Sequence, residues 1–300
     1  MDRIEMMRAF MAVAQEGSFT AAGRKLGRST KLVSKQVAAL ESEYQVQLLN
    51  RTTRSVALTA TGTAYLNRCR HLVEEFDELD ALVTEGHTSL SGSIRITAPT
   101  GFGAGPLSEA LAGFMAAHPN ISVDLHLTNL QVALVEEGFD LAVRVGIPRD
   151  STLMVRHLAP MPLVTCAAPS YLAAHGTPSH PKALATHRCM IDRNMGNPSA
   201  WSYWSKNGER TSISISGPVT VNAPAASATF ARAGLGIARC PLYQVAKDLE
   251  SGALVPLLPA FRSEEFSLFA LYPPTRNLTA RIRALIDHLA DQFSGDNPYL

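Results

Sequence analysis

The 300-residue chain lacks a long apolar run, and this absence excludes several classes of protein. Its richest apolar stretch, residues 110–117, is much shorter than the ~20 residues that a membrane-spanning helix needs. Glu5 also interrupts the apolar core that a secretory signal would require. We therefore expect a cytoplasmic protein with no membrane partner.

Cysteines are few, and the sequence has none of the common catalytic motifs. The four cysteines form no CxxC pair, so neither a zinc site nor a disulfide framework is indicated. We expect them to be buried small side chains in a reducing compartment; the alternative is a redox-sensing thiol at Cys166 or Cys240. HExxH, GxSxG and Walker motifs are also missing, so no catalytic centre, metal or cofactor is expected. The cysteines are Cys69, Cys166, Cys189 and Cys240.

The net charge of +1 hides an asymmetry along the chain. Residues 1–60 carry nine lysines and arginines against five acidic residues, whereas residues 61–90 carry two against six. A basic segment beside an acidic one is typical of a protein that docks a polyanion on the first and avoids the second.

Helical spacing of apolar residues predicts three helices at the N-terminus. The first covers residues 3–16, Ser18 caps the second over residues 19–26, and Ser29 or Thr30 begins the third. Two short helices joined by a tight turn indicate a helix-turn-helix unit.

The third predicted helix, STKLVSKQVAALE, has two different faces. Val33, Val37 and Leu40 recur at helical spacing and predict an inward stripe. Its other face presents basic side chains and hydroxyl groups, as a DNA-recognition helix does. That outward face carries Lys31, Ser34 and Lys35.

A β-ribbon and a long helix are expected next. Residues 52–58 are rich in β-branched side chains and lie beside Arg51 and Arg54, which favours a winged-helix ribbon that grips phosphates or the minor groove. Thr59 then caps a helix expected over residues 60–88, whose apolar residues alternate spacings of three and four. That pattern predicts a dimerising coiled-coil seam. The seam comprises Cys69, Leu72, Phe76, Leu79 and Val83.

Small polar residues at 89–92 indicate a hinge, after which extended and helical runs alternate over residues 93–300. This alternation predicts an α/β domain with a largely parallel sheet, divided into two lobes with a ligand cleft at the strand ends. Lobe I is expected to comprise residues 93–161 and 267–300, and lobe II residues 162–266. In lobe I the expected strands are 93–98, 121–128, 140–145 and 266–271, and the expected helices are 105–118, 130–137 and 278–293.

These residues resemble a known family along nearly the whole chain. GSFTAAGRKLGRSTKLVSKQVAALE followed by LLNRTTRSVALTATG is similar to the N-terminal domain of LysR-type transcriptional regulators. IRITAPTGFG, HPNISVDL, LVEEGFDLAVRVG, PSYLAAHG and ARAGLGIARCP continue the resemblance in order. Two departures are Gly23, where the family usually has alanine, and Tyr44-Gln45, where it usually has Leu-Gly.

The resemblance implies a fold and a function. It implies a mainly α winged helix-turn-helix over residues 1–59, a linker helix over 60–88, and a two-lobed effector-binding domain resembling a periplasmic binding protein over 93–300. The implied function is sequence-specific transcription regulation in response to a small-molecule effector. The implied partners are an interrupted palindromic operator in double-stranded DNA, RNA polymerase, and further copies of the chain in a homodimer or homotetramer.

The resemblance also carries over particular residues. Thr30, Lys31 and Ser34 are expected at base edges, with Lys35, Arg51 and Arg54 on phosphates or the wing. Arg144 either pairs with an effector carboxylate or forms an internal salt bridge to Asp140 or Glu137. Loop amides before Gly105 would suit an anionic effector. The implied effector-binding residues are Thr100, Gly101, Phe102, Thr128, Arg144, Gly146, Cys166, Asn222 and Ala223.

Two other functions compete for the C-terminal domain. Residues 101–105 read GFGAG, a glycine-rich turn between a strand and a helix that a nucleotide-dependent enzyme would have, but the GxGxxG spacing is incomplete. A solute-binding protein would have the same two-lobed fold, but it explains neither the basic helices nor the seam. We therefore favour a non-enzymatic regulator.

Overall fold

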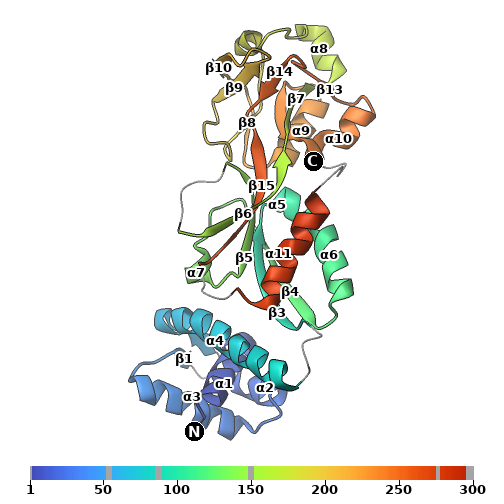
Figure 1. The fold of residues 1–300 in the computed structure, drawn as a ribbon. Coiled ribbons are helices and arrows are strands. Elements are labelled where there is room, and N and C mark those ends of the chain that lie inside the picture. Colours follow the sequence, from blue (N-terminus) through green and yellow to red (C-terminus); the bar gives the residue numbers. More distant parts are fainter. Residues whose placement is uncertain (1, 52–55, 85–89, 148–151, 275–277, 295–300) are drawn as a thin grey trace. The chain divides into compact units, whose positions relative to one another are not determined.

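The computed structural model describes residues 2–51, 56–84, 90–147, 152–274 and 278–294. The chain divides into two compact units, each described by itself below. The first is Met1–Gly92 with Val132–Phe139, and the second is Ser93–Gln131 with Asp140–Leu300 (Figure 1). Among the described residues, no helix is both long and apolar enough to cross a membrane.

Three helices form the core of the first unit, and serines cap two of them as expected. They are α1 (Arg3–Glu16), α2 (Phe19–Lys25) and α3 (Thr30–Tyr44). The Ser18 hydroxyl accepts a hydrogen bond from the backbone N–H of Ala21, and the Ser29 hydroxyl accepts one from Leu32. The predicted inward stripe of α3, Val33, Val37 and Leu40, is fully buried in the same core as Phe10.

Gly23 allows α2 to lie unusually close to the turn that precedes α3. A Cβ atom at this position would lie 2.8 Å from the carbonyl oxygen of Arg28 and 3.3 Å from the amide nitrogen of Thr30. The Arg28 N–H also donates to the Gly23 carbonyl at 2.8 Å. The glycine therefore has a packing reason that offsets its cost inside a helix.

A two-stranded ribbon and a long helix complete the first unit. The antiparallel strands β1 (Leu49–Arg51) and β2 (Val56–Leu58) precede α4 (Ala60–Thr84). The Thr59 hydroxyl caps α4 by accepting from the N–H of Gly62 at 2.9 Å. Residues 85–88 of the predicted linker helix lie outside the described residues.

The second unit begins with a five-stranded sheet that is mixed, so the expectation of a largely parallel sheet was wrong. In the order β4-β3-β5-β15-β6, β3 and β5 are parallel, but β15 is antiparallel to both β5 and β6. The antiparallel pairs arise because β6 leaves the lobe and β15 returns to it beside β6. The strands are β3 (Gly92–Ala98), β4 (Ile121–Leu127), β5 (Leu141–Gly146), β6 (Met154–Met161) and β15 (Phe266–Tyr272).

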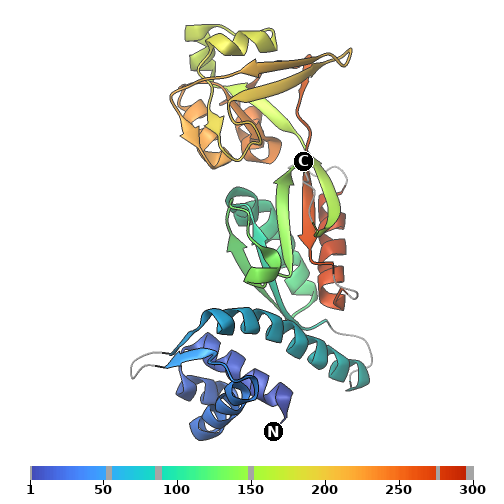
Figure 2. The same cartoon turned by 90° about the vertical axis from the view of Figure 1, so that its left-hand side faces the viewer.

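Helices of this first lobe include α6 and the C-terminal α11, which lie beside each other and alongside the sheet in both cartoon views (Figures 1 and 2). A short turn of helix and a π-helical turn containing Pro106 lead into α6, so the expected helix at 105–118 has an irregular start. The α7 segment is a single turn belonging to the first unit. The helices of this lobe are α5 (Thr100–Phe102), η1 (Gly103–Leu107), α6 (Ser108–Ala117) and α11 (Ala280–Phe293), and the turn in the first unit is α7 (Leu134–Glu137).

The other lobe is built from short strands, several of which the sequence patterns did not predict. Strands β7, β12 and β13 are antiparallel, β8 and β11 are parallel, and β10-β9-β14 is an antiparallel sheet. Its strands are β7 (Leu163–Ala167), β8 (Ile191–Asp192), β9 (Ala200–Ser205), β10 (Arg210–Ser214), β11 (Thr220–Val221), β12 (Ala238–Pro241), β13 (Val255–Pro256) and β14 (Phe261–Ser263). Its helices are α8 (Pro169–His175), η2 (Pro181–Thr186), α9 (Pro224–Arg232) and α10 (Leu242–Glu250).

Candidate DNA-reading and effector-binding sites

The outward face of α3 presents the residue types that the sequence assigned to DNA. Thr30, Lys31 and Lys35 are exposed, and Ser34 is half-buried. Leu32 lies beside them with 41% of its surface exposed, an apolar position that the sequence pattern did not single out. The face therefore offers hydroxyls, ammonium groups and one apolar side chain to a groove.

Most other basic side chains of the first unit are neutralised within it. Ion pairs join Lys25 to Glu16 at 2.9 Å and Arg3 to Glu43. In the described part of this segment, the cations of residues 1–51 without a carboxylate partner are Arg24, Lys31 and Lys35. The basic surplus seen in the sequence is thus concentrated at the end of α2 and on α3.

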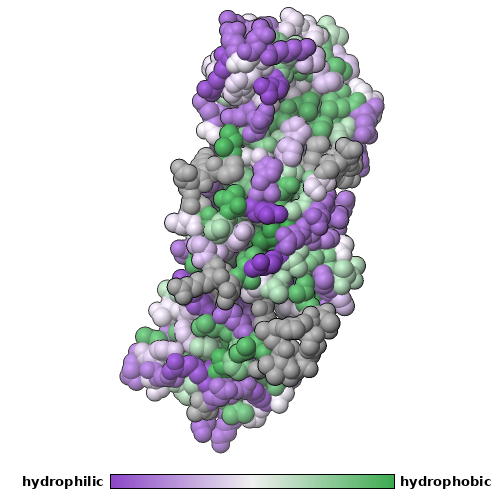
Figure 3. Space-filling model, in the orientation of Figure 1, coloured by the Kyte–Doolittle hydropathy of each residue, from purple (hydrophilic) through white to green (hydrophobic). Residues whose placement is uncertain are grey.

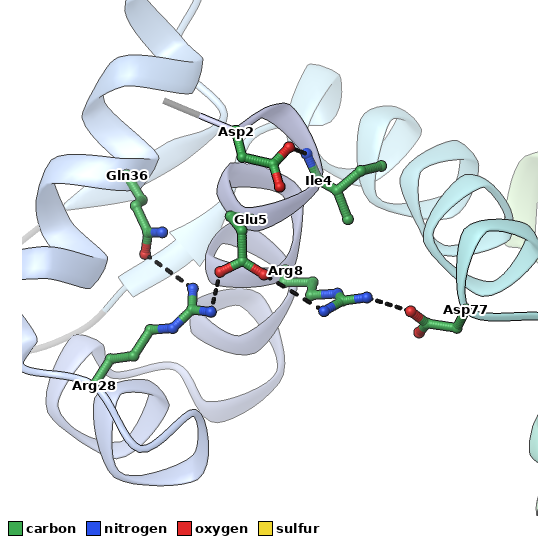
Figure 4. A network of polar contacts seen from close by, with 7 residues as sticks. All are labelled: Asp2, Ile4, Glu5, Arg8, Arg28, Gln36 and Asp77. Carbon is green, nitrogen blue, oxygen red and sulfur yellow. Dashed lines mark hydrogen bonds and ion pairs between the residues drawn. The ribbon is translucent and has the colours of Figure 1, made fainter. Parts of the chain in front are cut away.

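An ion-pair network explains why Arg28 is not one of these free cations (Figure 4). Its guanidinium pairs with Glu5 of α1 and donates to the Gln36 side chain of α3 at 3.5 Å. Glu5 also pairs with Arg8, which in turn pairs with Asp77 of α4. The close-up shows these side chains pointing toward one another from three helices and the α2–α3 turn. Through Gln36, the network connects α3 to the Arg28–Glu5 ion pair.

The two predicted wing arginines stand differently. Arg51 pairs with Glu41 of α3 at 2.6 Å, and its guanidinium carbon lies 5.0 Å from the ring centroid of Phe19. Glu41 also accepts hydrogen bonds from the backbone N–H groups of Leu48 and Leu49. Arg51 is therefore anchored to the helix-turn-helix, while Arg54 lies outside the described residues.

The predicted dimerisation seam is largely an uncovered stripe on α4. Leu72, Phe76 and Leu79 are 52%, 40% and 58% exposed. Cys69 differs, because it is buried against Met7 of α1 and so packs within the unit instead of on the stripe. The side chain of Val83 lies outside the described residues.

Asn129, which the sequence patterns missed, joins the two lobes of the second unit. Its side-chain oxygen accepts from the backbone N–H of Thr100 at 3.0 Å, and its Nδ2 donates to the Asn222 carbonyl at 2.7 Å. Asn194 Nδ2 donates to the same carbonyl at 2.6 Å. The sequence signal that could have found Asn129 is its position in the turn after a strand, where ligand contacts are common.

Several predicted effector residues lie near this junction. Thr128 precedes Asn129 and its hydroxyl accepts from the Leu130 N–H at 3.2 Å, while Ala223 is the N-cap of α9 and follows Asn222. A Cβ atom added at Gly101 would lie 3.4 Å from the Tyr243 hydroxyl of the other lobe. Thr100, Gly101 and Asn222 are thus brought together.

Phe102 and Cys166 are placed where they present no surface to a ligand, which corrects that part of the expectation. Phe102 is fully buried, with its ring 5.4 Å from that of Tyr243 and 5.3 Å from that of Phe293. Cys166 is fully buried in the core of lobe II. Strand-end position alone did not distinguish these inward side chains from exposed neighbours.

Arg144 and Gly146 lie at the end of β5. The Arg144 guanidinium donates to the Thr97 hydroxyl at 3.1 Å and to its neighbour's carbonyl, that of Val143, at 3.0 Å. Burial lowers the pKa of Arg144 to about 10. Gly146 has φ +148°, a conformation that side chains disfavour.

Lobe II contains two buried charged residues that sequence reasoning missed. Arg239 is 3% exposed, and its Nε and Nη1 atoms have no hydrogen-bond partner, although its guanidinium carbon lies 5.1 Å from the Trp201 ring centroid. Asp192 is 4% exposed and its Oδ2 atom also lacks a partner. Burial lowers the pKa of Arg239 and raises that of Asp192.

The cysteine environments favour the structural interpretation over redox sensing. All four are buried. Burial raises the pKa of Cys166 and of Cys189 to about 12, and raises that of Cys240 well above its ordinary value. A thiol held in its neutral form is a weak nucleophile and a poor redox sensor.

Comparison with known families covers nearly the whole chain. The model described as bacterial regulatory helix-turn-helix protein, lysR family, matches residues 4–63. The LysR substrate binding domain matches residues 87–294. Both units therefore have counterparts in one family, in the order that the sequence indicated.

Individual relatives agree over full length. The HTH-type transcriptional activator AaeR of Escherichia coli is 33% identical over 98% of this chain and 94% of its own. Among solved structures, CrgA of Neisseria meningitidis, a LysR-type transcriptional regulator, is 29% identical with a TM-score of 0.61, covering 97% and 99% of the two chains. The Vibrio cholerae virulence activator AphB is 26% identical with a TM-score of 0.59 over the same shares.

Proposed function

Because the chain belongs to the LysR family of transcriptional regulators, we propose that it reads its operator with the outward face of α3. Thr30, Lys31 and Ser34 contact base edges, and Lys35 contacts a phosphate. One observation carries this assignment: Lys31 and Lys35 lack carboxylate partners among the described residues, while Lys25, Arg28 and Arg51 are paired. DNA phosphates can pair with such ammonium groups, because no carboxylate of the protein already neutralises them.

Leu32 gives the same face an apolar contact. Its exposed side chain lies between Lys31 and the buried Val33, and a thymine methyl group is the apolar feature that the major groove offers. Arg51 and Arg54 contact phosphates, and at Arg51 the phosphate replaces or shares the ion pair with Glu41. Because the operator DNA lies in the cytoplasm, the protein acts there.

Operator variants separate base reading from phosphate contact. Thr30→Ala should alter preference at one base pair at a cost of roughly 1–3 kcal/mol, whereas Lys35→Ala should weaken binding to all sequences alike. Gel shifts with the matched operator and a scrambled duplex measure both effects, with Lys206→Ala in lobe II as the control. Unchanged binding of both α3 variants would overturn the assignment.

Dimerisation through α4 follows from its exposed apolar stripe. The same stripe of a second copy would cover Leu72, Phe76 and Leu79. The two helix-turn-helix units of such a dimer would bind the two half-sites of an interrupted palindrome. A tetramer would join two such dimers. Phe76→Glu should convert the dimer to monomer in light scattering, while Met115→Glu, an exposed apolar position on α6, serves as the matched control.

The effector of this protein binds at the lobe junction around Asn129. Three turns converge there: the one before α5, the one after β4, and the one before α9. A ligand that replaces the Asn129 contact to Asn222 changes how the lobes are joined, which changes subunit packing.

A ligand screen tests the junction. The full-length protein is screened by thermal shift with small carboxylates, aromatic compounds and amino acids. A ligand that stabilises the wild type should bind Asn129→Ala with at least tenfold lower apparent affinity. Asn207→Ala, an exposed position in the turn between β9 and β10, should respond like wild type. Equal affinity for Asn129→Ala would place the effector elsewhere.

A further inference from the structure

A pocket on lobe I lies apart from the lobe junction. It is formed where the edge strand β6 and the end of β15 meet α11. At the pocket, Tyr272 of β15 pairs with Met154 of β6. At the opposite end of the two strands, the crossover where β6 leaves the lobe and β15 returns, Phe266 pairs with Met161. At about 3.3 Å per residue, the seven-residue step from Met161 to Met154 puts the pocket roughly 20 Å along the sheet from the crossover. The lining is Met154, Arg156, Tyr272, Pro274, Leu278, Arg283, Ile286 and Asp287.

Positive charge dominates this pocket. Arg156 comes from β6 and Arg283 from α11, so two separate elements each contribute a guanidinium to one hollow. Within the described residues, neither guanidinium forms an ion pair or a hydrogen bond. Asp287 is the one acid in the lining, which leaves a net charge of one positive unit. Free guanidinium groups suit a carboxylate, which they can hold through two hydrogen bonds.

The start of α11 adds the positive end of a helix dipole. Thr279 is its N-cap, and the Thr279 side chain makes no capping hydrogen bond. The Thr279 hydroxyl oxygen is itself buried without a partner. Leu278 and Arg283, which line the pocket, flank this uncapped first turn. The positive end of the helix dipole favours an anion there.

The rest of the lining is apolar. Met154 is 49% exposed, and Pro274 and Leu278 lie on the same rim with the Tyr272 ring. Figure 3 shows strongly hydrophilic and apolar residues side by side on the face that displays α11. A solvated salt-bridge surface would not need this apolar wall, whereas a ligand with an apolar body would bury it.

We propose that this pocket is a second ligand site, specific for an amphipathic monoanion in which a carboxylate is attached to an aromatic or branched apolar body. The carboxylate lies between Arg156, Arg283 and the first turn of α11, and the apolar body covers Met154, Pro274 and Leu278. Binding on lobe I is separate from the proposed junction site and does not require it.

Phenylacetate is the probe, and phenylacetamide is its neutral counterpart of the same shape. Isothermal titration of the full-length protein should show saturable binding of phenylacetate and at least tenfold weaker binding of phenylacetamide. The double variant Arg156→Gln/Arg283→Gln should lose at least tenfold in phenylacetate affinity. Arg262→Gln, the same change at an exposed arginine of lobe II, should bind like wild type.

The junction variant separates the two sites. Asn129→Ala should retain phenylacetate binding at the lobe I pocket, and operator gel shifts of every variant should match wild type and so report intact folding. The proposal is overturned if the wild type does not bind phenylacetate, if the amide binds equally, or if the double arginine variant binds like wild type. Loss of binding in Asn129→Ala alone would assign the probe to the junction instead.

Discussion

The first unit and lobe II of the second unit place charged groups that lack partners in opposite environments. In the first unit the arginines that hold helices together are paired with carboxylates, and the free cations Lys31 and Lys35 are exposed on α3. In lobe II the oppositely charged Arg239 and Asp192 are buried, and Nε and Nη1 of Arg239 and Oδ2 of Asp192 have no hydrogen-bond partner. Exposed unpaired charge suits a long polyanion, whereas buried unpaired charge suits a small ligand or water. The location of the charge, more than its amount, therefore distinguishes the two functions.

Reversing one charge on α3 should have the largest effect. Lys35→Glu places an unpaired carboxylate against DNA and should weaken operator binding by about 100-fold, by loss of a contact and added repulsion. Fluorescence anisotropy with a labelled operator measures this. Lys206→Glu, an equal change of net charge in lobe II, should stay within about threefold of wild type. Equal losses would mean that only net charge matters.

Two buried arginines test whether the absence of partners matters in the second unit. Arg239 and Arg281 are both 3% exposed, but Arg281 Nε donates to the Ser93 carbonyl at 3.2 Å. Arg281→Met should cost about 2–3 kcal/mol of unfolding free energy, because it leaves a buried carbonyl without its donor. Arg239→Met should stay within about 1 kcal/mol of wild type or be more stable. Urea denaturation measures both; the reverse order would contradict the contrast.

The carboxyl of Asp192 gives a pH-dependent test. Burial raises its pKa, so the folded state binds this proton more tightly than the unfolded state does. The ionised form therefore costs stability above that raised pKa, and the cost disappears as the pH falls to its ordinary value of 3.8. Asp192→Asn should be more stable than wild type at pH 7, and the gain should shrink on acidification. A gain that is constant with pH would contradict this cause.

The smallest effect is expected at the end of α3, away from either set of charges. Gln45 adopts φ 53°, a left-handed conformation that favours glycine, and the family usually has glycine here. Gln45→Gly should stabilise the first unit by up to about 1 kcal/mol, reduced by loss of the Gln45 hydrogen bond to the Ser42 carbonyl. Thermal unfolding measures it, and operator affinity should not change.

Local signals in the sequence predicted the first unit well because its structure depends on local rules. Ser18 and Ser29 are caps, and Val33 and Leu40 recur at helical spacing, so each element could be read from adjacent residues. Contacts between distant residues were not readable. The Arg28 pair with Glu5 and the burial of Cys69 against Met7 depend on how helices pack.

The second unit was predicted less completely. Strand β6 lacks alternating burial over most of its length, with Met154 to His157 all exposed, and the unpredicted β13 and β14 are two and three residues long. Such strands exist because neighbouring strands pair with them. The same reason explains why Asn129 was missed, since its role is defined by Asn222 in the other lobe.

Salt dependence of operator binding tests the central claim most directly. Lys31→Ala/Lys35→Ala and Arg3→Ala/Lys25→Ala each remove two positive charges from the first unit, but the second pair is already neutralised by Glu43 and Glu16. Each lost phosphate contact lowers the slope of log affinity against log salt by about 0.9. We predict a slope reduced by about 0.9 for the α3 pair, in which Lys35 is the phosphate contact, and an unchanged slope for the paired cations. Equal reductions in both variants would contradict the account.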